Sequence, residues 1–375
     1  MKLGIIADVH AANHRRFGGA SRAGVNTRCQ QIINTLYGVR EACLKRQVER
    51  LVIAGDLFDT TRPEPQIVAE VQRAIEQDED ALAVTVLSGN HDRVSDAAGD
   101  HALGPLVPVC QVVDTPTIQR DPDVDLWLVP VLQGVAAESL PLALSRLAEE
   151  QGQTPTGPQP PPRVLALHLG LIDGETPPWL RDSGSALPVE TVARLAKQYG
   201  IAAVFAGDWH ETNSWSVDGV ELVQVGAMCP TGFDNPGLGE YGSLWVWDSK
   251  TGKMERVVIP GPRFVRVGVG DHIPVARVRK ASQGGSSVYV SVTVMPDAYD
   301  KAKETAQSCK NEGIVEDYEV LLDSSDAEIQ ARTAAQAARS ASTLGEALAG
   351  FVGEMQLPDG ITREEVMERA AEYLR

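Results

Sequence analysis

Residues 201–211 read IAAVFAGDWHE, and an apolar run in this stretch ends at an acid and an imidazole. Short runs of Val, Ile, Leu and Ala without polar alternation are typical of strands that are buried on both faces of a parallel sheet. Ligand sites in such sheets form beyond the carboxyl ends of the strands. The stretch therefore predicts a central strand that delivers Asp208 and His210 to a site.

Four other runs end in the same way. They are LGIIADVH (3–10), RLVIAGDLFD (50–59), ALAVTVLSGNHD (81–92) and RVLALHLG (163–170). Their polar residues are Asp8, His10, Asp56, Asp59, Asn90, His91, Asp92 and His168. Stretches with helical spacing of apolar residues lie between most of the runs, at 28–48, 66–76, 136–150 and 188–198. This alternation predicts an α/β fold with mostly parallel strands.

Each cluster alone has an ordinary structural explanation. An Asp after a strand is usually a turn former or a helix cap, and a lone His is more often a structural residue than a ligand. Five such clusters are hard to explain by folding alone, because four of the seven histidines fall in them. The other three, His14, His101 and His272, lie outside the clusters, and we expect them to have no role in the site.

The residue types indicate a particular chemistry. Carboxylate, imidazole and amide ligands without thiolate suit Mn²⁺, Fe or Zn²⁺, and oxygen-rich sites favour Mn²⁺. Seven ligands are too many for one ion but natural for two, if one carboxylate bridges them. Two metals about 3.5–4 Å apart can clamp a phosphoryl group and activate a water between them. The pattern therefore predicts a hydrolase of phosphoesters.

The motifs D-x-H, G-D-x-x-D, G-N-H-D, a lone His and G-x-x-H, in this order, resemble those of the calcineurin-like metallophosphoesterases. The resemblance covers about residues 1–260 and implies a four-layer α/β/β/α sandwich. It implies seven metal ligands, with Asp56 as the bridge: Asp8, His10, Asp56 and His210 for the first metal, and Asn90, His168 and Asp208 to complete the second. His91 resembles the catalytic histidine of the family, which protonates or stabilises the leaving oxygen, and Asp59 resembles the acid that orients it.

Asp208 departs from the family pattern, since most relatives have a histidine there. A carboxylate can still bind a metal and makes the site more anionic, so we expect Mn²⁺ or Mg²⁺ to be preferred over Zn²⁺. The alternative is that Asp208 does not bind and that the second metal is held weakly.

Three longer stretches resemble one branch of the family, the SbcD-type DNA repair exonucleases. They are GDLFD with GNHD, DLWLVPVL (125–132), and the segment from VQVGAMCPTGF to LWVWDSKTGKMERVVIPG. Phage-like members are the most similar, and the meiotic recombination nuclease of eukaryotes is a cousin. The resemblance implies a DNA exonuclease or endonuclease subunit that works with an SbcC-type ATPase in repair or recombination, and it implies a homodimer.

The chain after the sandwich has a different pattern. We expect a phosphoesterase domain over 1–262, whose residues 221–260 form hairpins that complete the second sheet, and a small β-α-β cap over 263–330. A linker at 331–343 and a helical tail at 344–375 follow. The tail resembles the SbcD-type segment that binds the ATPase coiled coil, and its apolar stripes hold Leu344, Leu348, Phe351, Val352, Val366, Met367 and Leu374. The alternative is that the stripes dock on their own domain.

Composition limits the partners. The net charge of −17 argues against a protein that coats DNA through a basic face, so the ATPase would supply much of the DNA-binding charge. No window approaches about 18 uninterrupted apolar residues, which argues against a membrane span, and we expect no membrane among the partners. Five scattered cysteines indicate reduced thiols and a cytoplasmic protein. Two rival functions stay open: a phosphoesterase for small substrates, and a catalytically weak architectural subunit of the ATPase complex.

Overall fold

The structure is a computed structural model that describes residues 1–76, 82–95, 97–151, 160–174, 185–233, 242–267, 287–295 and 298–323. The five apolar runs all form strands. These are β1 (Lys2–Ile6), β4 (Arg50–Ile53), β5 (Ala83–Leu87), β9 (Arg163–His168) and β12 (Ile201–Gly207). The predicted helices are also present, as α1 (Thr27–Lys45), α2 (Pro65–Ile75), α3 (Ala136–Gln151) and α5 (Val189–Gln198).

The strands make two six-stranded sheets. The first has the order β16-β15-β1-β4-β5-β6 and includes β6 (Gln111–Val113), β15 (Gly242–Asp248) and β16 (Met254–Ile259). The second has the order β13-β14-β12-β9-β8-β7 and includes β7 (Thr117–Asp121), β8 (Val124–Val129), β13 (Asn213–Val217) and β14 (Val220–Gln224). In each sheet the four neighbouring strands β1-β4-β5-β6 and β14-β12-β9-β8 run parallel.

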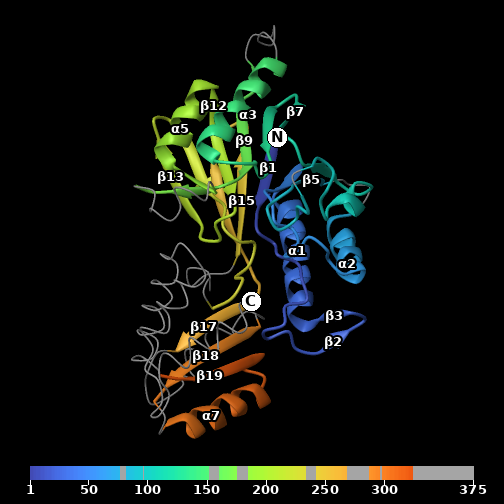
Figure 1. Ribbon diagram of the computed structural model, residues 1–375, viewed down its shortest axis with the longest axis vertical. Coiled ribbons are helices and arrows are strands. Elements are labelled where there is room, and N and C mark those ends of the chain that lie inside the picture. The colour runs from blue at the N-terminus through green and yellow to red at the C-terminus, as the bar shows by residue number, and fades with distance from the viewer. Residues whose placement is uncertain are drawn as a thin grey trace, which may run out of the picture. The chain divides into compact units, whose positions relative to one another are not determined.

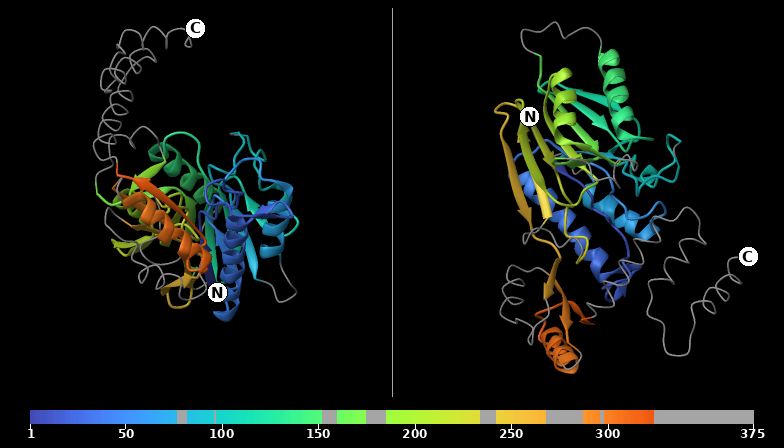
Figure 2. Two further views of the ribbon diagram at one scale, coloured as in Figure 1. Left: turned by 90° about the horizontal axis from the view of Figure 1, so that it is seen from below. Right: turned by 60° about the vertical axis from the view of Figure 1, so that its left-hand side comes forward.

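Alternating side chains of one strand explain the layering. Ile6, on β1, packs with the cluster that holds α1 and α2, whereas Leu3 and Ile5 of the same strand pack with Leu126 and Phe205 of the second sheet. The helices α3 and α5 cover the outer face of the second sheet through a separate apolar cluster. Figures 1 and 2 show the two helix pairs on opposite sides of the two sheets. This is the predicted four-layer α/β/β/α sandwich.

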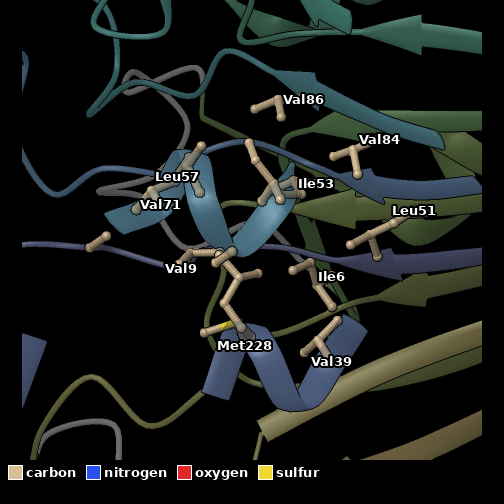
Figure 3. Packing of buried hydrophobic residues seen from close by; sticks show 14 of the residues in the cluster. Ile6, Val9, Val39, Leu51, Ile53, Leu57, Val71, Val84, Val86 and Met228 are labelled. Carbon is tan, nitrogen blue, oxygen red and sulfur yellow. The ribbon is translucent and has the colours of Figure 1, made fainter. Parts of the chain in front are cut away.

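The helix side of the first sheet is a continuous apolar core. Figure 3 shows Leu51, Ile53, Val84 and Val86 of the parallel strands in one cluster with Val39 of α1. Local capping fixes where α1 begins, because the Asn26 side chain accepts a hydrogen bond from the Cys29 amide at 2.8 Å. The core therefore holds β1, β4 and β5 rigidly, and their carboxyl ends carry the candidate site.

The hairpin of β15 and β16 corrects one expectation. It joins the first sheet through antiparallel pairing of β15 with β1, and does not complete the second. Among the described residues of the predicted region, those of β14 belong to the second sheet, where β14 pairs with the preceding strand β13. Alternation predicts that a segment is a strand, but it does not predict which of two sheets offers the free edge.

Shorter elements complete the described chain. The pairs β2 (Ser21–Arg22) with β3 (Val25–Asn26) and β10 (Gly170–Ile172) with β11 (Ala186–Pro188) form two small ladders, and a 3₁₀ turn, η1, spans Gly104–Leu106. The region predicted as a β-α-β unit contains β18 (Val288–Val294), α7 (Tyr299–Asn311) and β19 (Asp317–Leu322), and β17 (Arg263–Val267) joins them in a sheet of order β17-β18-β19.

The chain divides into two compact units. The first contains residues 1–267, 273–291 and 304–319, and the described parts of the second are 292–295, 298–303 and 320–323. The predicted domain boundary at residue 262 stays a prediction, and the linker and the helical tail lie outside the described residues. None of the described helices is long and apolar enough to cross a membrane. The five cysteines are all buried.

Candidate metal centre

The predicted site residues come from the ends of strands in both sheets. Asp8 and Asp56 follow β1 and β4, His168 is the last residue of β9, and Asp208 follows β12 directly. Two hydrogen bonds join the sheets here: the Asp208 amide donates to Asp8 Oδ1 at 3.1 Å, and His168 Nδ1 lies 2.8 Å from the Ala54 carbonyl oxygen. The carboxyl ends of the two parallel strand sets therefore meet at one place.

The backbone of this place is unusual. Asp8, His10, Asp56 and Asp208 have φ angles of +52°, +49°, +50° and +79°. Residues other than Gly seldom adopt this left-handed conformation, although Asp tolerates it better than most. Such conformations cost free energy and cluster at functional sites. Four of them in one set of loops indicate that the loops are shaped for a ligand.

Gly89 shows how tightly the loops approach. A Cβ atom at this position would lie 2.0 Å from Asp56 Oδ1, so only glycine fits beside that carboxylate. Glycine in the G-N-H-D motif is thus required by the packing of the motif against Asp56.

The first ligand set, defined as Asp8, His10, Asp56 and His210, is rich in nitrogen. The Nε2 atoms of His10 and His210 lie 3.0 Å apart. Ligand atoms of Asp8, His10 and His210 all fall within 4.8 Å of one another. Two imidazole nitrogens that approach so closely beside a carboxylate are a suitable cradle for a divalent cation.

The second ligand set, defined as Asp56, Asn90, His168 and Asp208, is rich in oxygen. His168 Nε2 lies 2.7 Å from Asn90 Oδ1, 3.6 Å from Asp208 Oδ1 and 3.6 Å from Asp56 Oδ2. The carboxylate of Asp208, the departure from the family pattern, therefore lies together with the other predicted ligands of the second metal.

Asp56 lies between the two sets. Its Oδ1 accepts a hydrogen bond from the His91 amide at 2.9 Å, which fixes the carboxylate. Its Oδ2 lies 3.9 Å from His10 Nε2 and 3.6 Å from His168 Nε2. This is the position that a bridging carboxylate needs.

Each of three histidines has a partner at Nδ1 and turns Nε2 toward the centre. His168 Nδ1 must carry its proton, because the Ala54 carbonyl can only accept. His10 Nδ1 lies 2.9 Å from the Asp59 carboxylate, and His210 Nδ1 lies 3.3 Å from the hydroxyl of Thr231. Partners of this kind fix the tautomer and the ring orientation of metal-binding histidines.

The electrostatics of the centre favour a cation. Asp8 Oδ2 is buried, and no group in the described part of the chain donates a hydrogen bond to it. Burial, together with the charges of Asp56 and Asp208, raises the pKa of Asp8 to about 7. A buried acceptor without a donor is costly, and a divalent cation would satisfy it and neutralise the acids. The residues present therefore fit a dinuclear metal site.

The histidine pKa values differ between the two sets. Burial, reinforced by the charge of His10, lowers the pKa of His210 to about 4. Burial alone would lower the pKa of His168 as well, but the hydrogen bond and charge of Asp56, with the charges of Asp8 and Asp208, raise it to about 10. His210 is thus neutral without metal, whereas His168 holds a proton that a metal must displace.

His91 lies beside both sets, but Asp59 is arranged differently from the expectation. The Asp59 carboxylate contacts His10 Nδ1 at 2.9 Å and is 3.8 Å from His91 Nδ1. His91 Nδ1 instead lies 3.3 Å from the backbone carbonyl of Asp59. The predicted pairing of the Asp59 side chain with His91 is therefore looser than its pairing with His10. His91 also shares a possible ligand cluster with His10 and Asp56.

Three buried or partly buried residues support the site, and of these only Asp92 lies in a sequence motif, G-N-H-D. Asp92 accepts hydrogen bonds from the amides of Leu57, Phe58 and Gly89, and so ties two motifs together. Gln224 donates to the carbonyls of Ala206, Gly207 and Trp209, and so holds the turn before His210. Thr231 contacts His210, as described above. His14, expected to lie outside the site, is 3.8 Å from the Asp59 carboxylate, whereas His101 faces Asp114.

A cavity of about 340 Å³ opens next to the second ligand set. Asn90, His168 and Asp208 form its polar side. Its other walls are mainly apolar and come from residues 129–136 and 167–169. A phosphoester could therefore place its phosphate at the ligands and an apolar or ring-shaped group in the cavity.

Comparisons with known proteins identify the family. A family model described as calcineurin-like phosphoesterase matches residues 1–212. Over 93 residues the chain is 29% identical to the DNA double-strand break repair protein Mre11 of Methanopyrus kandleri, a match that covers 24% of this chain and 19% of that protein. Solved structures similar to the chain include TT1561 of Thermus thermophilus, with a TM-score of 0.41, 13% identity and coverage of 68% of this chain and 98% of that one. A dimetal phosphatase from Danio rerio is similar with a TM-score of 0.40 and 12% identity, and the match covers 65% of this chain and 92% of that one.

The sandwich and its site define a metal-dependent phosphoester hydrolase. The chain belongs to the calcineurin-like phosphoesterase family, whose model matches more than half of its residues.

Proposed function

We propose that the chain is a two-metal-dependent DNA exonuclease or endonuclease subunit of SbcD type. The observation that carries the proposal is the pair of ligand sets that share Asp56 and lie beside His91. The partial likeness to a DNA double-strand break repair protein supports DNA as the substrate. The three longer stretches that resemble SbcD-type exonucleases support the same branch.

In this proposal Asp8, His10, Asp56 and His210 hold the first metal, and Asn90, His168 and Asp208 complete the second with Asp56 as the bridge. The oxygen-rich second set favours Mn²⁺, with Mg²⁺ as the other candidate. When bound, the two ions would supply Lewis-acid stabilisation of the phosphoryl oxygens and would lower the pKa of a water, so that hydroxide is available as the nucleophile at neutral pH.

His91 is the proposed catalytic histidine. Its amide is held by Asp56 and its Nδ1 faces the Asp59 carbonyl, so Nε2 is the free ring nitrogen. A proton on Nε2 can pass to the leaving sugar oxygen as the phosphodiester bond breaks. The ring packs edge-on against His10, with centroids 4.9 Å apart, which keeps it next to the first ligand set. Asp59 would act mainly by orienting His10 and only secondarily on His91.

The partners are proposed from the resemblance. An SbcC-type coiled-coil ATPase would bind the tail residues 344–375, a homodimer would form, and the complex would act on DNA in the cytoplasm during repair or recombination. Since the net charge is −17, the ATPase would contribute much of the positive surface that holds the phosphate backbone.

A phosphodiesterase for small substrates is the second candidate. The acidic net charge and the small cavity of about 340 Å³ beside Asn90, His168 and Asp208 favour it, because both suit a small ester better than a long polyanion.

The test uses end-labelled duplex DNA, single-stranded DNA and bis-(p-nitrophenyl) phosphate, each with Mn²⁺, Mg²⁺ or EDTA. We expect Mn²⁺-dependent shortening of DNA that His91→Ala reduces by about 10²–10⁴-fold, the usual contribution of a general acid. His101→Ala is the matched control, because His101 faces Asp114 and lies outside both ligand sets. Cleavage of the small ester alone, also after an SbcC-type partner is added, would favour the second candidate. No turnover of any substrate would leave the architectural role.

A further inference from the structure

Arg28, near the start of α1, is a buried arginine that forms an ion pair with no acid in the described part of the chain. Only 6% of its surface is exposed. In the described ranges it forms no ion pair; it donates to two backbone carbonyls, those of Arg16 (at 3.0 Å) and Thr231. Burying an arginine is costly unless its hydrogen bonds serve the fold or the site. Its two acceptors lie far apart in the chain, and one of them belongs to the residue that contacts His210.

The contact with Thr231 leads directly to the first ligand set. The Thr231 hydroxyl lies 3.3 Å from His210 Nδ1, while His210 Nε2 lies 3.0 Å from His10 Nε2. A carbonyl and a hydroxyl of one residue are closely linked, so a guanidinium that holds the carbonyl also restricts where the hydroxyl lies. The described structure thus has a continuous path from Arg28 through Thr231 to the ring of His210.

An aromatic cluster fixes the other side of the guanidinium. The cluster consists of Phe17, Phe233, Phe264 and Tyr289. The Arg28 guanidinium carbon lies 5.0 Å from the centre of the Phe264 ring, a cation–π distance, and Phe264 stacks on Tyr289 at 5.0 Å. Phe264 belongs to β17, and Tyr289 to the part of β18 that lies in the first compact unit, so both strands contribute to this support.

We propose that Arg28 is a positioning residue for the first metal: it holds Thr231, which orients His210, and the aromatic cluster holds Arg28 in turn. The proposal rests on the proposed role of His210 as a metal ligand. It makes the first ligand set dependent on β17 and β18, while the second set, whose histidine is held by the Ala54 carbonyl, is independent of them.

The experiment measures Mn²⁺ binding to metal-free protein by titration calorimetry. We expect Arg28→Gln and Thr231→Val each to weaken one of two sites about tenfold, the usual effect of losing a partner of a metal-binding histidine. Thr231→Ser keeps the hydroxyl and should bind like the wild type. The double variant Arg28→Gln with Thr231→Val should bind no more weakly than either single variant, because both changes break the same path.

A second arginine offers a matched control. Arg163 is also partly buried, donates to a backbone carbonyl, that of Tyr199, at 2.7 Å, and lies 5.8 Å from the centre of the Trp127 ring. It begins β9, whose other end carries His168. Arg163→Gln should leave both metal sites unchanged. Thermal unfolding is measured first, and if Arg28→Gln fails to fold, Phe264→Leu replaces it, since this removes the ring next to the guanidinium.

His210→Ala separates the two levels of the proposal. If His210→Ala binds both metals as the wild type does, His210 is no ligand and the role of Arg28 falls with it. If His210→Ala loses one metal site, the ligand role of His210 stands. The positioning role of Arg28 is then overturned by any of three results: Arg28→Gln binds Mn²⁺ normally, it weakens both sites equally, or it adds its full effect to that of Thr231→Val.

Discussion

The two ligand sets share Asp56, yet they are held in different ways. In the first set, side chains support the imidazoles: Asp59, whose side chain is 38% exposed, supports His10, and Thr231 supports His210. In the second set, His168 ends a central strand, its side chain is 1% exposed, and a backbone carbonyl supports it. A site held by backbone within a sheet is less adjustable than one held by side chains on loops.

The sets also differ in ligand type. Two imidazole nitrogens face the first position, while one imidazole nitrogen and oxygens of Asn90, Asp208 and Asp56 face the second. Nitrogen ligands are compatible with Zn²⁺, Mn²⁺ or Fe, whereas oxygen ligands favour Mn²⁺ or Mg²⁺. The comparison therefore predicts that the second position decides which metal supports activity.

Asp56→Asn should break the comparison, because it removes the charge that both sets share. We expect hydrolysis of bis-(p-nitrophenyl) phosphate to fall by about a thousandfold or more, since metal-based stabilisation contributes several kcal/mol and each 1.36 kcal/mol is about tenfold. Both metals should bind more weakly, as measured by metal content after gel filtration. Asp218→Asn, a change of the same type at an exposed position, should alter neither. Loss of only one metal from Asp56→Asn would argue against a bridge.

The strand ends could be predicted from the sequence because they combine two signals. An apolar run without alternation marks a buried strand, and a cluster of acid and imidazole marks its exit. All five runs are strands, and Asp8, Asp56, Asn90, His168 and His210 lie together, while their role as metal ligands stays a prediction. The pairing of motifs across two sheets, and the order of the layers, came from the family resemblance, since spacing along one chain does not reveal which sheets stack.

The supports of the site could not be predicted. The Ala54 carbonyl has no side-chain signature, because any residue offers one. Gln224 lies on an ordinary strand, and Thr231 in a loop, so neither forms a motif with the residue that it holds. The Asp59 carboxylate turns to His10, since both are on loops whose relative rotation is fixed only by tertiary packing. Sequence patterns thus indicate the ligands better than the groups that orient them.

The pH dependence of metal binding should sharpen the comparison. The pKa of His168 is raised to about 10, so between about pH 6 and 9 a metal at the second position must displace its proton. The pKa of His210 is lowered to about 4, so its ring at the first position is already neutral. Asp8, with a pKa of about 7, adds a further proton release below that pH. Metal affinity at the second position should therefore rise about tenfold per pH unit. At the first position, metal affinity should rise more gently with pH above about pH 7.

Calorimetry in buffers with different ionisation enthalpies counts these protons directly. In the wild type we expect at least one proton released per Mn²⁺ at the second, more pH-sensitive position at about pH 8. His168→Asn removes the titrating ring and should flatten the pH dependence at that site. Equal slopes at both positions would contradict the difference between the two sets.

Asp208→His tests the smallest effect, the metal preference of the second set. The substitution introduces the histidine that the family resemblance leads us to expect there and exchanges an oxygen ligand for a nitrogen. Because Asp208 Oδ1 lies only 3.6 Å from His168 Nε2, we expect competition binding to shift about tenfold from Mn²⁺ toward Zn²⁺. Asp208→Asn keeps an oxygen without its charge, so it should weaken both ions without changing their order. If neither variant changes either affinity, Asp208 does not bind the second metal, and the oxygen-rich character of that set would rest on Asn90 and Asp56 alone.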